Sequence, residues 1–169
     1  MFRLVSPRRI ALALAAFALL GLAGHVVAGE DAPFKGSLEG NVTVAPLTPP
    51  YVQVDVDAAG KATHLGRFSL AIPHVVNRAS STAIGSYEFT AANGDTLTAD
   101  FTGQAMPTET PGVLAIVETA TITGGTGRFA GATGSFTTER LFDTVAGTTA
   151  GSFKGTLRLR DDDDDGDDD

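Results

Sequence analysis

Apolar and polar residues alternate along most of the chain, from Phe34 to Leu159. In Phe34–Val44 the even positions are apolar or glycine and the odd positions are polar, and Tyr51–Val56 repeats the alternation. A period of two is typical of strands with one buried face, because successive side chains of a strand point to opposite sides of the sheet. No segment in this part of the sequence has the period of a helix. The pattern therefore predicts an all-β domain.

The alternation divides into eight predicted strands, separated by short segments rich in turn-forming residues. The strands are expected at residues 34–45, 51–57, 62–73, 83–91, 96–106, 113–123, 132–143 and 149–159. Short connections between strands that each have one apolar face predict an eight-stranded antiparallel up-and-down barrel of the lipocalin-like kind. Closure of the sheet removes its exposed edges. A sandwich of two sheets fits the same alternation and is the alternative fold.

The stretch Ile122–Phe136, ITGGTGRFAGATGSF, holds five glycines in fifteen residues. A Walker-type phosphate loop requires a lysine after its last glycine, and none follows here. A dinucleotide-binding loop requires Gly-x-Gly-x-x-Gly before a helix, but the third glycine comes one residue late and the following residues are strand-like. The stretch is therefore predicted to be a structural corner between two strands. Its turn residues are expected to be Gly124, Gly125, Gly127, Phe129, Gly131 and Gly134.

Glu118–Gly134 resembles the Gly-Gly-Thr-Gly-Lys/Arg-Phe-x-x-Ala-x-Gly turn of the dirigent and allene oxide cyclase barrel superfamily. It is more similar still to uncharacterised secreted bacterial proteins with this motif, as are Gly60–Phe68 and Ala92–Gly103. The resemblance implies an eight-stranded barrel with a central cavity. Members of the superfamily cyclise oxylipins or direct the coupling of phenoxy radicals. Their catalytic side chains do not map onto this sequence residue by residue, so the resemblance implies no particular activity.

The two ends of the sequence differ in composition from the predicted barrel. Residues 1–9 are basic and residues 10–28 are almost wholly apolar, with small or β-branched residues at positions 26–28. This is the layout of a secretory signal peptide, and an uncleaved membrane anchor is the alternative. We expect a signal peptide at residues 1–28, a barrel domain at 29–160 and a disordered Asp-rich tail at 161–169. The chain has no cysteine. We expect the domain to be secreted or periplasmic, with no stable membrane association after cleavage. Because it can form no disulfide, its stability would depend on its hydrophobic core alone.

The net charge of −8 comes from the Asp-rich tail. Without the eight aspartates of residues 161–169, the 20 acidic residues fall to 12, which equals the number of Lys and Arg residues. No basic cluster is visible in the sequence, so nucleic acid is not an expected partner. The spacing of Asp161, Asp163, Asp165 and Gly166 matches half of an EF-hand loop, but the closing Glu is missing. Loose binding of divalent cations is expected of such a tail.

Polar residues on the predicted apolar face are the candidates for a site, because burying them without partners costs a few kcal/mol. Strand parity places Glu118, Arg140 and His64 on that face. They are the candidates for the polar end of a ligand pocket, with Glu118 and Arg140 close enough for an ion pair. The alternative is that Glu118 and Arg140 only satisfy each other in a closed core and that His64 is exposed near a strand end. No metal site and no cofactor is predicted.

These features predict a secreted β-barrel that binds a small, mostly apolar ligand in its central cavity. A small barrel either fills its interior with side chains or holds one small ligand. Two alternatives stay open. One is a cyclase or isomerase of the allene oxide cyclase-like kind that uses the same cavity, with a Glu or His as general acid or base. The other is a non-catalytic structural or surface protein with a filled barrel. The sequence does not decide whether the protein is an enzyme.

Overall fold

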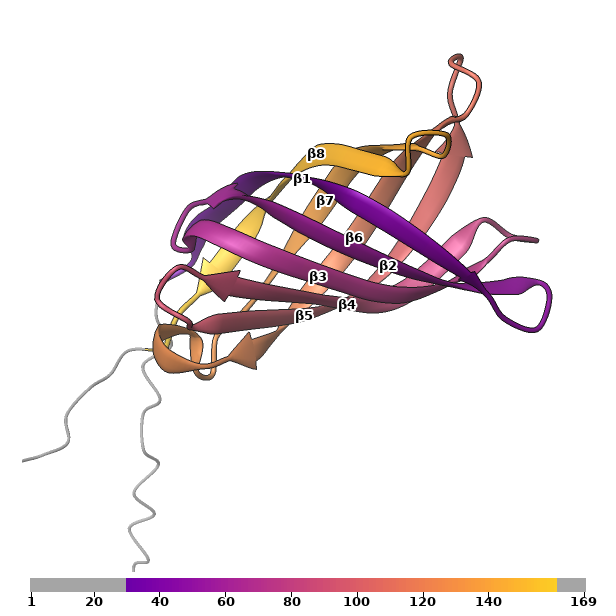
Figure 1. Ribbon diagram of the computed structural model, residues 1–169. Helices are drawn as coiled ribbons and strands as arrows, with labels where there is room; N and C mark the ends of the chain where they lie inside the picture. Colours follow the sequence, from indigo (N-terminus) through magenta and orange to yellow (C-terminus); the bar gives the residue numbers. More distant parts are fainter. Residues whose placement is uncertain (1–29, 161–169) are drawn as a thin grey trace, which may run out of the picture.

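The computed structural model describes residues 30–160 (Figure 1). The expected signal peptide and the Asp-rich tail lie outside these residues, so what the sequence predicts for them stays a prediction. Within residues 30–160, no helix has both the length and the apolar character needed to cross a membrane.

Eight antiparallel strands form a closed barrel in sequence order, and β8 pairs with β1 to complete it. The strands are β1 (Ala32–Pro46), β2 (Tyr51–Ala62), β3 (Gly66–Asn77), β4 (Thr82–Ala91), β5 (Thr96–Pro107), β6 (Val113–Gly125), β7 (Thr133–Asp143) and β8 (Thr148–Arg158). The all-β, eight-stranded up-and-down barrel predicted from the alternation is confirmed. The sandwich alternative is wrong, because one continuous ladder of strand pairs runs round the whole molecule.

The hairpin between β2 and β3 lies later in the sequence than expected. Residues 58–61, predicted as a turn, belong to β2, and the chain turns at residues 63–65 instead. Thr63 fixes this turn: its hydroxyl donates to the Pro33 carbonyl at 2.8 Å and accepts the Lys35 backbone N–H at 3.0 Å. Gly60, one of the residues between the two predicted strands, lies within β2. A Cβ at Gly60 would come within 2.8 Å of the Phe68 ring.

The two ends of the barrel differ. At one end, here called the open end, lie the turns at residues 47–50, 78–81, 108–112 and 144–147. The hairpins there splay apart (Figure 1). At the other, the closed end, lie the turns at residues 63–65 and 92–95, the β6–β7 connection and both ends of the described chain (Figure 1). Three fully or almost fully buried side chains, Leu65, Phe129 and Leu157, block the closed end.

The glycine-rich stretch forms the connection between β6 and β7. A single 3₁₀ turn, η1 (Gly127–Phe129), follows β6 and carries the Phe129 ring into the closed end of the barrel. Gly127 has a φ of 55° and Gly131 a φ of 70°, which is the left-handed region that glycine adopts without steric cost. The glycines therefore shape a turn around a buried aromatic anchor.

Phenylalanines fill the closed half of the barrel. Every pair among Phe34, Phe89, Phe136 and Phe153 has ring centroids between 5.0 and 6.0 Å apart. Phe34 and Phe89 meet almost at right angles, with an interplanar angle of 81°, an edge-to-face arrangement that aromatic rings favour. Tyr87 stacks on Phe89 at 5.7 Å. The aromatic cluster therefore reaches a tyrosine near the middle of the barrel, and Phe101 also packs against this tyrosine, with its ring 5.1 Å from the Tyr87 ring.

Glycines on neighbouring strands make room for these rings. Gly36 on β1 lies directly opposite Phe153 on β8, and Gly155 on β8 lies opposite Phe136 on β7. A Cβ at Gly36 would lie 2.6 Å from the Phe153 ring, and one at Gly155 would lie 2.7 Å from the Phe136 Cβ. Both glycines therefore lie where a side chain of the adjacent strand crosses the interior.

The exchange Gly36→Ala tests this packing. We expect it to lower the free energy of unfolding by about 1–3 kcal/mol, because the added methyl group overpacks the aromatic cluster. Urea unfolding followed by circular dichroism measures the change. Ser37→Ala, on the exposed face of the same strand, is the matched control and should change stability by no more than about 0.5 kcal/mol. Equal effects of the two substitutions would contradict the packing argument.

Candidate functional site

The open half of the barrel contains a pocket of about 120 Å³. Its walls are mainly aliphatic and come from β1 to β6: Val42, Val44, Val52, Val54, Val76, Ala83, Ala105 and Ile116. Phe142 of β7 also lines it, and the polar side chains that reach it from within the barrel are His74, Glu118 and Arg140. Exposed apolar side chains continue beyond the pocket on the hairpins of the open end: Val44, Leu47, Tyr51, Met106 and Val145. An apolar molecule could approach the pocket over this rim.

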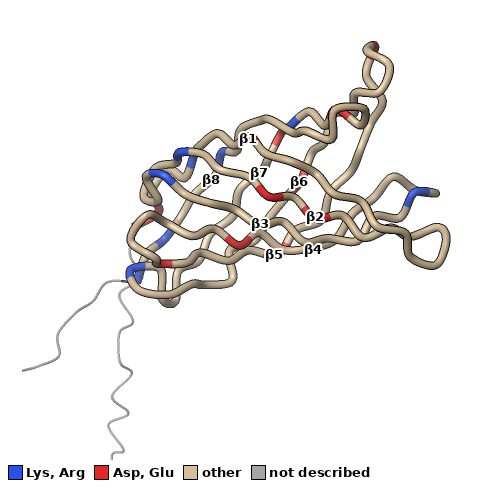
Figure 2. The backbone as a smooth tube through the Cα atoms, viewed as in Figure 1, with Lys and Arg blue, Asp and Glu red and all other residues tan. Residues whose placement is uncertain are grey.

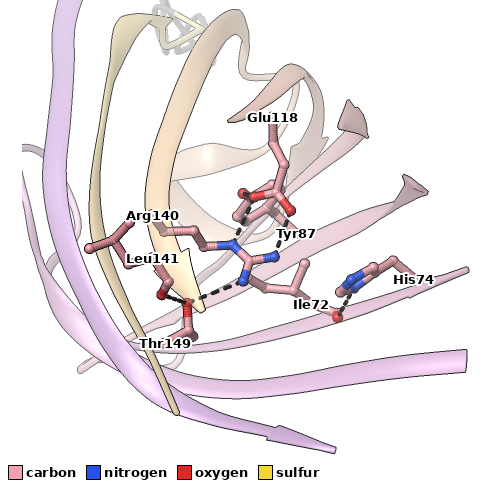
Figure 3. A network of polar contacts seen from close by, with 7 residues as sticks. All are labelled: Ile72, His74, Tyr87, Glu118, Arg140, Leu141 and Thr149. Atoms are coloured by element: carbon pink, nitrogen blue, oxygen red, sulfur yellow. Dashed lines mark hydrogen bonds and ion pairs between the residues drawn. The ribbon is translucent and has the colours of Figure 1, made fainter. Parts of the chain in front are cut away.

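Glu118 and Arg140 form an ion pair below the pocket (Figure 3). Arg140 Nη2 donates to Glu118 Oε1 at 2.7 Å, and Arg140 Nε donates to Glu118 Oε2 at 3.1 Å. The two side chains are only 3% and 1% exposed. The structure therefore brings these two predicted residues together as a bidentate pair, in which the planar guanidinium matches the carboxylate geometry.

Two further hydroxyl groups complete this polar layer. Tyr87 donates its hydroxyl proton to Glu118 Oε2, and Arg140 Nη1 donates to Thr149 Oγ1 at 3.2 Å. Thr149 in turn donates to the Leu141 carbonyl at 2.8 Å. Sequence reasoning missed Tyr87 and Thr149, although both lie on the apolar face by strand parity. The network holds the guanidinium and the carboxylate in one orientation, with each donor directed to a defined acceptor.

Glycines make room for the polar layer as they do for the rings. Gly103 lies opposite Glu118 on the adjacent strand, and Gly151 lies opposite Arg140. A Cβ at Gly103 would lie 2.7 Å from Glu118 Cγ, and one at Gly151 would lie 2.5 Å from Arg140 Cβ. The ion pair therefore occupies space that two neighbouring strands leave free.

Burial and the charge of Glu118 together set the protonation states of Tyr87 and Arg140. It raises the pKa of Tyr87 well above its usual value, and the negative charge of Glu118 raises it further. For Arg140, burial alone lowers the pKa, but the hydrogen bonds and charge of Glu118 outweigh that effect and the pKa is raised. Tyr87 therefore keeps its proton and Arg140 keeps its charge at neutral pH, so the charges of the ion pair balance.

His74, on β3, is the pocket residue that the sequence prediction missed. Its side chain lines the pocket and packs its ring against Phe101 at 5.6 Å. Nδ1 lies 2.9 Å from the Ile72 carbonyl, which can only accept, so Nδ1 carries the proton. Burial lowers the pKa of His74; the Ile72 hydrogen bond opposes this shift, and nearby Arg140 adds to it. The ring is thus neutral at pH 7, and Nε2 carries a lone pair.

His64 does not belong to this site. It lies exposed in the β2–β3 turn at the closed end, in the left-handed region with a φ of 63°. Parity failed because it was counted along a strand that does not extend through residue 64. The predicted strand ended at residue 73, one position before His74, although Phe68, Leu70 and Ile72 share the face of His74. Extending that alternation by one step would have found the correct histidine.

The described residues offer no candidate metal centre, since no three His, Cys, Asp or Glu side chains of residues 30–160 come together as ligands. One buried hydroxyl, Thr138 Oγ1, finds no hydrogen-bond partner within the described part of the chain. Thr138 lies opposite Glu118 in the β6–β7 register. The chemistry of the site therefore rests on an ion pair, a phenol, hydroxyl groups and one neutral imidazole.

Comparisons with known proteins bear on the fold. No protein-family model matches the sequence, and no curated protein matches it. Among solved structures, the fold is similar to that of a pterocarpan synthase dirigent protein, with a TM-score of 0.54 and 13% sequence identity over 88% of this chain and 97% of that one. At this identity the likeness concerns the fold alone. The chain therefore has a dirigent-like β-barrel, as its resemblance to that superfamily implies.

His74 makes stability depend on pH. Because its pKa is lower in the folded chain than the unperturbed value of 6.5, the folded state binds fewer protons than the unfolded state as the pH falls through this range. Stability is therefore fully present above about pH 6.5 and decreases below it, by up to about 1.4 kcal/mol per pH unit. We expect His74→Gln to remove this part of the decrease between about pH 7 and pH 5. Chemical unfolding at each pH measures it.

The matched control is His64→Gln, because His64 is exposed at the other end of the barrel. We expect that variant to show the same loss of stability with falling pH as the unaltered chain. If His64→Gln removed the pH dependence and His74→Gln left it unchanged, His74 would not be the buried neutral group described here.

Proposed function

We propose that this protein binds a small, neutral, mostly apolar molecule in the pocket at the open end of its barrel. The observation that carries the proposal is an aliphatic pocket that ends on a buried, charge-balanced polar layer. Ligand sites have this character: mostly apolar walls and a few fixed polar groups that orient the ligand. The barrel is packed with aromatic rings in one half and hollow in the other. This favours a ligand-binding protein over the alternative of a structural protein with a filled barrel.

The polar groups around the pocket favour a ligand without net charge. Glu118 neutralises Arg140, Tyr87 is protonated and His74 is neutral. A charged ligand group at this layer would lose its hydration without gaining an uncompensated partner charge. Arg78, which also lines the pocket, lies exposed in the β3–β4 turn at the open end. Arg140 uses three of its five N–H groups on Glu118 and Thr149. Its remaining N–H groups could donate to a hydroxyl or carbonyl oxygen of the ligand, and His74 Nε2 could accept from a hydroxyl group.

The volume of the pocket limits the size of the buried part of the ligand. A cavity of roughly 150 Å³ accommodates benzene, and this pocket measures about 120 Å³. It is smaller than most ligand sites, which begin near about 300 Å³. We therefore infer that one ring, or a branched group of similar size, occupies the pocket and that any larger remainder extends across the apolar rim.

The proposed setting is outside the cytoplasm, in a secreted or periplasmic form. This part of the proposal rests on the signal-like pattern of residues 1–28. The likeness to a dirigent protein supports the barrel and is too distant to carry the synthase activity named for that protein.

Filling the pocket tests the binding proposal. Ala83 lines the pocket and Ile84, the next residue of β4, is 65% exposed on the outer face. We expect Ala83→Trp to weaken the binding of benzene, phenol and indole at least about tenfold, because the indole side chain occupies their space. Ile84→Trp adds the same group outside the barrel and should leave binding unchanged. Ligand-observed NMR measures the dissociation constants. Equal binding by both variants, or no binding by the unaltered chain, would overturn the proposal.

One observation favours a second candidate, an isomerase or cyclase that uses the same pocket. With Nδ1–H held by the Ile72 carbonyl, His74 presents a basic Nε2 in a largely apolar setting, as a general base requires. Glu118 is a poorer base, because Arg140 and Tyr87 already occupy both of its oxygens. The polar layer would then hold the substrate while His74 moves a proton.

A simple ketone tests this candidate. If His74 acts as a base, the unaltered chain should accelerate exchange of the α-protons of cyclohexanone in D₂O, and His74→Gln should lose at least about 90% of the acceleration. NMR follows the exchange. His64→Gln is the control and should retain it. Exchange at the solvent rate with the unaltered chain would count against this chemistry.

A further inference from the structure

Basic side chains gather at the closed end of the barrel. In Figure 2 most of the blue segments lie at this end, and fewer lie elsewhere on the barrel. Four of these residues, Lys154 on β8, Lys35 on β1, Lys61 on β2 and Arg67 on β3, lie on four consecutive strands and are exposed. We call them the cation stripe. The stripe includes all three lysines of the chain. The expectation that the domain lacks a basic cluster is therefore wrong, because the fold joins residues that are far apart in the sequence.

The strand register makes this arrangement unfavourable by itself. Lys154 lies directly opposite Lys35, and Lys61 lies directly opposite Arg67. Because Ser37 pairs with Lys61, the two pairs are diagonal neighbours across β1 and β2. Like charges directly opposite each other on antiparallel strands repel and destabilise the sheet. Four exposed cations therefore lie on four adjacent strands of the outer wall, with Glu39 of β1 as a diagonal neighbour of Lys61.

No ion pair within residues 30–160 engages the stripe. Two other basic residues at this end do form ion pairs, Arg158 with Asp31 at 2.9 Å and Arg128 with Asp95 at 3.7 Å. The four stripe residues form none with any side chain of residues 30–160. Arg78 in the open-end turn is also without an ion pair among residues 30–160, but it stands apart from other cations, whereas the stripe gathers four on adjacent strands. The stripe is therefore the place where an anionic occupant from outside these residues would gain most.

The chain itself supplies such an occupant. Immediately after Arg160, eight of the nine residues 161–169 are aspartates. Arg160 lies beside Gly131 at the closed end, where a Cβ on Gly131 would lie 3.4 Å from Arg160 Cδ. An extended segment of nine residues spans about 30 Å, and Lys154, six residues before Arg160, lies within about 20 Å along β8. Tethering a short segment beside its site gives it an effective concentration near the millimolar range.

We propose that residues 161–169 dock on the cation stripe of the same chain. The carboxylates alternate with the paired cations and remove the repulsion across β8–β1 and β2–β3. The contact is an exposed electrostatic one, so high salt weakens it. While it is docked, the Asp-rich segment also shields the stripe from other polyanions. The inference is independent of the pocket, which opens at the other end of the barrel.

A carbodiimide tests the contact in the full chain, because it joins a carboxylate to an amine only where the two touch. At about 20 mM salt, mass spectrometry should find Asp161–169 peptides joined to the peptides of Lys35, Lys61 or Lys154 within monomers. At about 1 M salt, where the screening length is near 3 Å, these products should fall at least about fivefold. Lys35→Gln and Lys154→Gln should each lose only their own product.

A second variant guards against non-specific reaction. With all eight aspartates of residues 161–169 changed to asparagine, backbone amide NMR signals should shift beside the stripe on β8, β1, β2 and β3. Signals of the open-end turn at residues 144–147 should not move. The proposal is overturned by absent products, by products that persist at high salt, by products found only in cross-linked dimers, which would place the segment on a second copy, or by shifts spread evenly over the barrel.

Discussion

The width of the barrel governs everything inside it. Eight strands enclose an interior just wide enough for side chains to meet at the axis. A large inward side chain therefore needs a gap on the adjacent strand, and glycine provides it. Gly36 faces Phe153, Gly103 faces Glu118 and Gly151 faces Arg140. The same device accommodates an aromatic ring in the closed half and a charged group in the middle. Towards the open end the inward positions are mostly valines, whose side chains are too short to fill the interior, and a pocket remains.

Stability alone does not account for the buried ion pair. Taking two charges out of water costs several kcal/mol per ion, and their attraction often only offsets that cost. A pair of well-packed apolar side chains would hold the barrel together at least as well. Glu118 and Arg140 nevertheless occupy the layer between the aromatic cluster and the pocket, with Tyr87 and Thr149 fixing their orientation. Such a layer gives the pocket a polar floor of defined geometry without a net charge, and an apolar floor could not do so.

Much of the fold could be read from the sequence because strand alternation is a local signal. The eight strands, their antiparallel order and the inward positions of Glu118 and Arg140 all follow from a period of two. The position of the β2–β3 turn could not be predicted in this way. Glycine is common in turns, but Gly60 lies within a strand and leaves room there for the Phe68 ring. That single misplacement exchanged His64 for His74. Cross-strand neighbours such as Lys35 and Lys154 depend on register, which hydrophobic alternation alone leaves undetermined.

The described chain starts and finishes at the same end of the barrel, and the pocket faces away from that end. Anything joined to either terminus, whether a neighbouring domain, a carrier or a solid support, would sit behind the molecule and leave its mouth unobstructed. Immobilisation through residue 30 or residue 160 would accordingly present every copy with the pocket facing outward. This orientation follows from the topology: in a meander with an even number of antiparallel strands, the first strand starts and the last strand ends at the same end of the barrel.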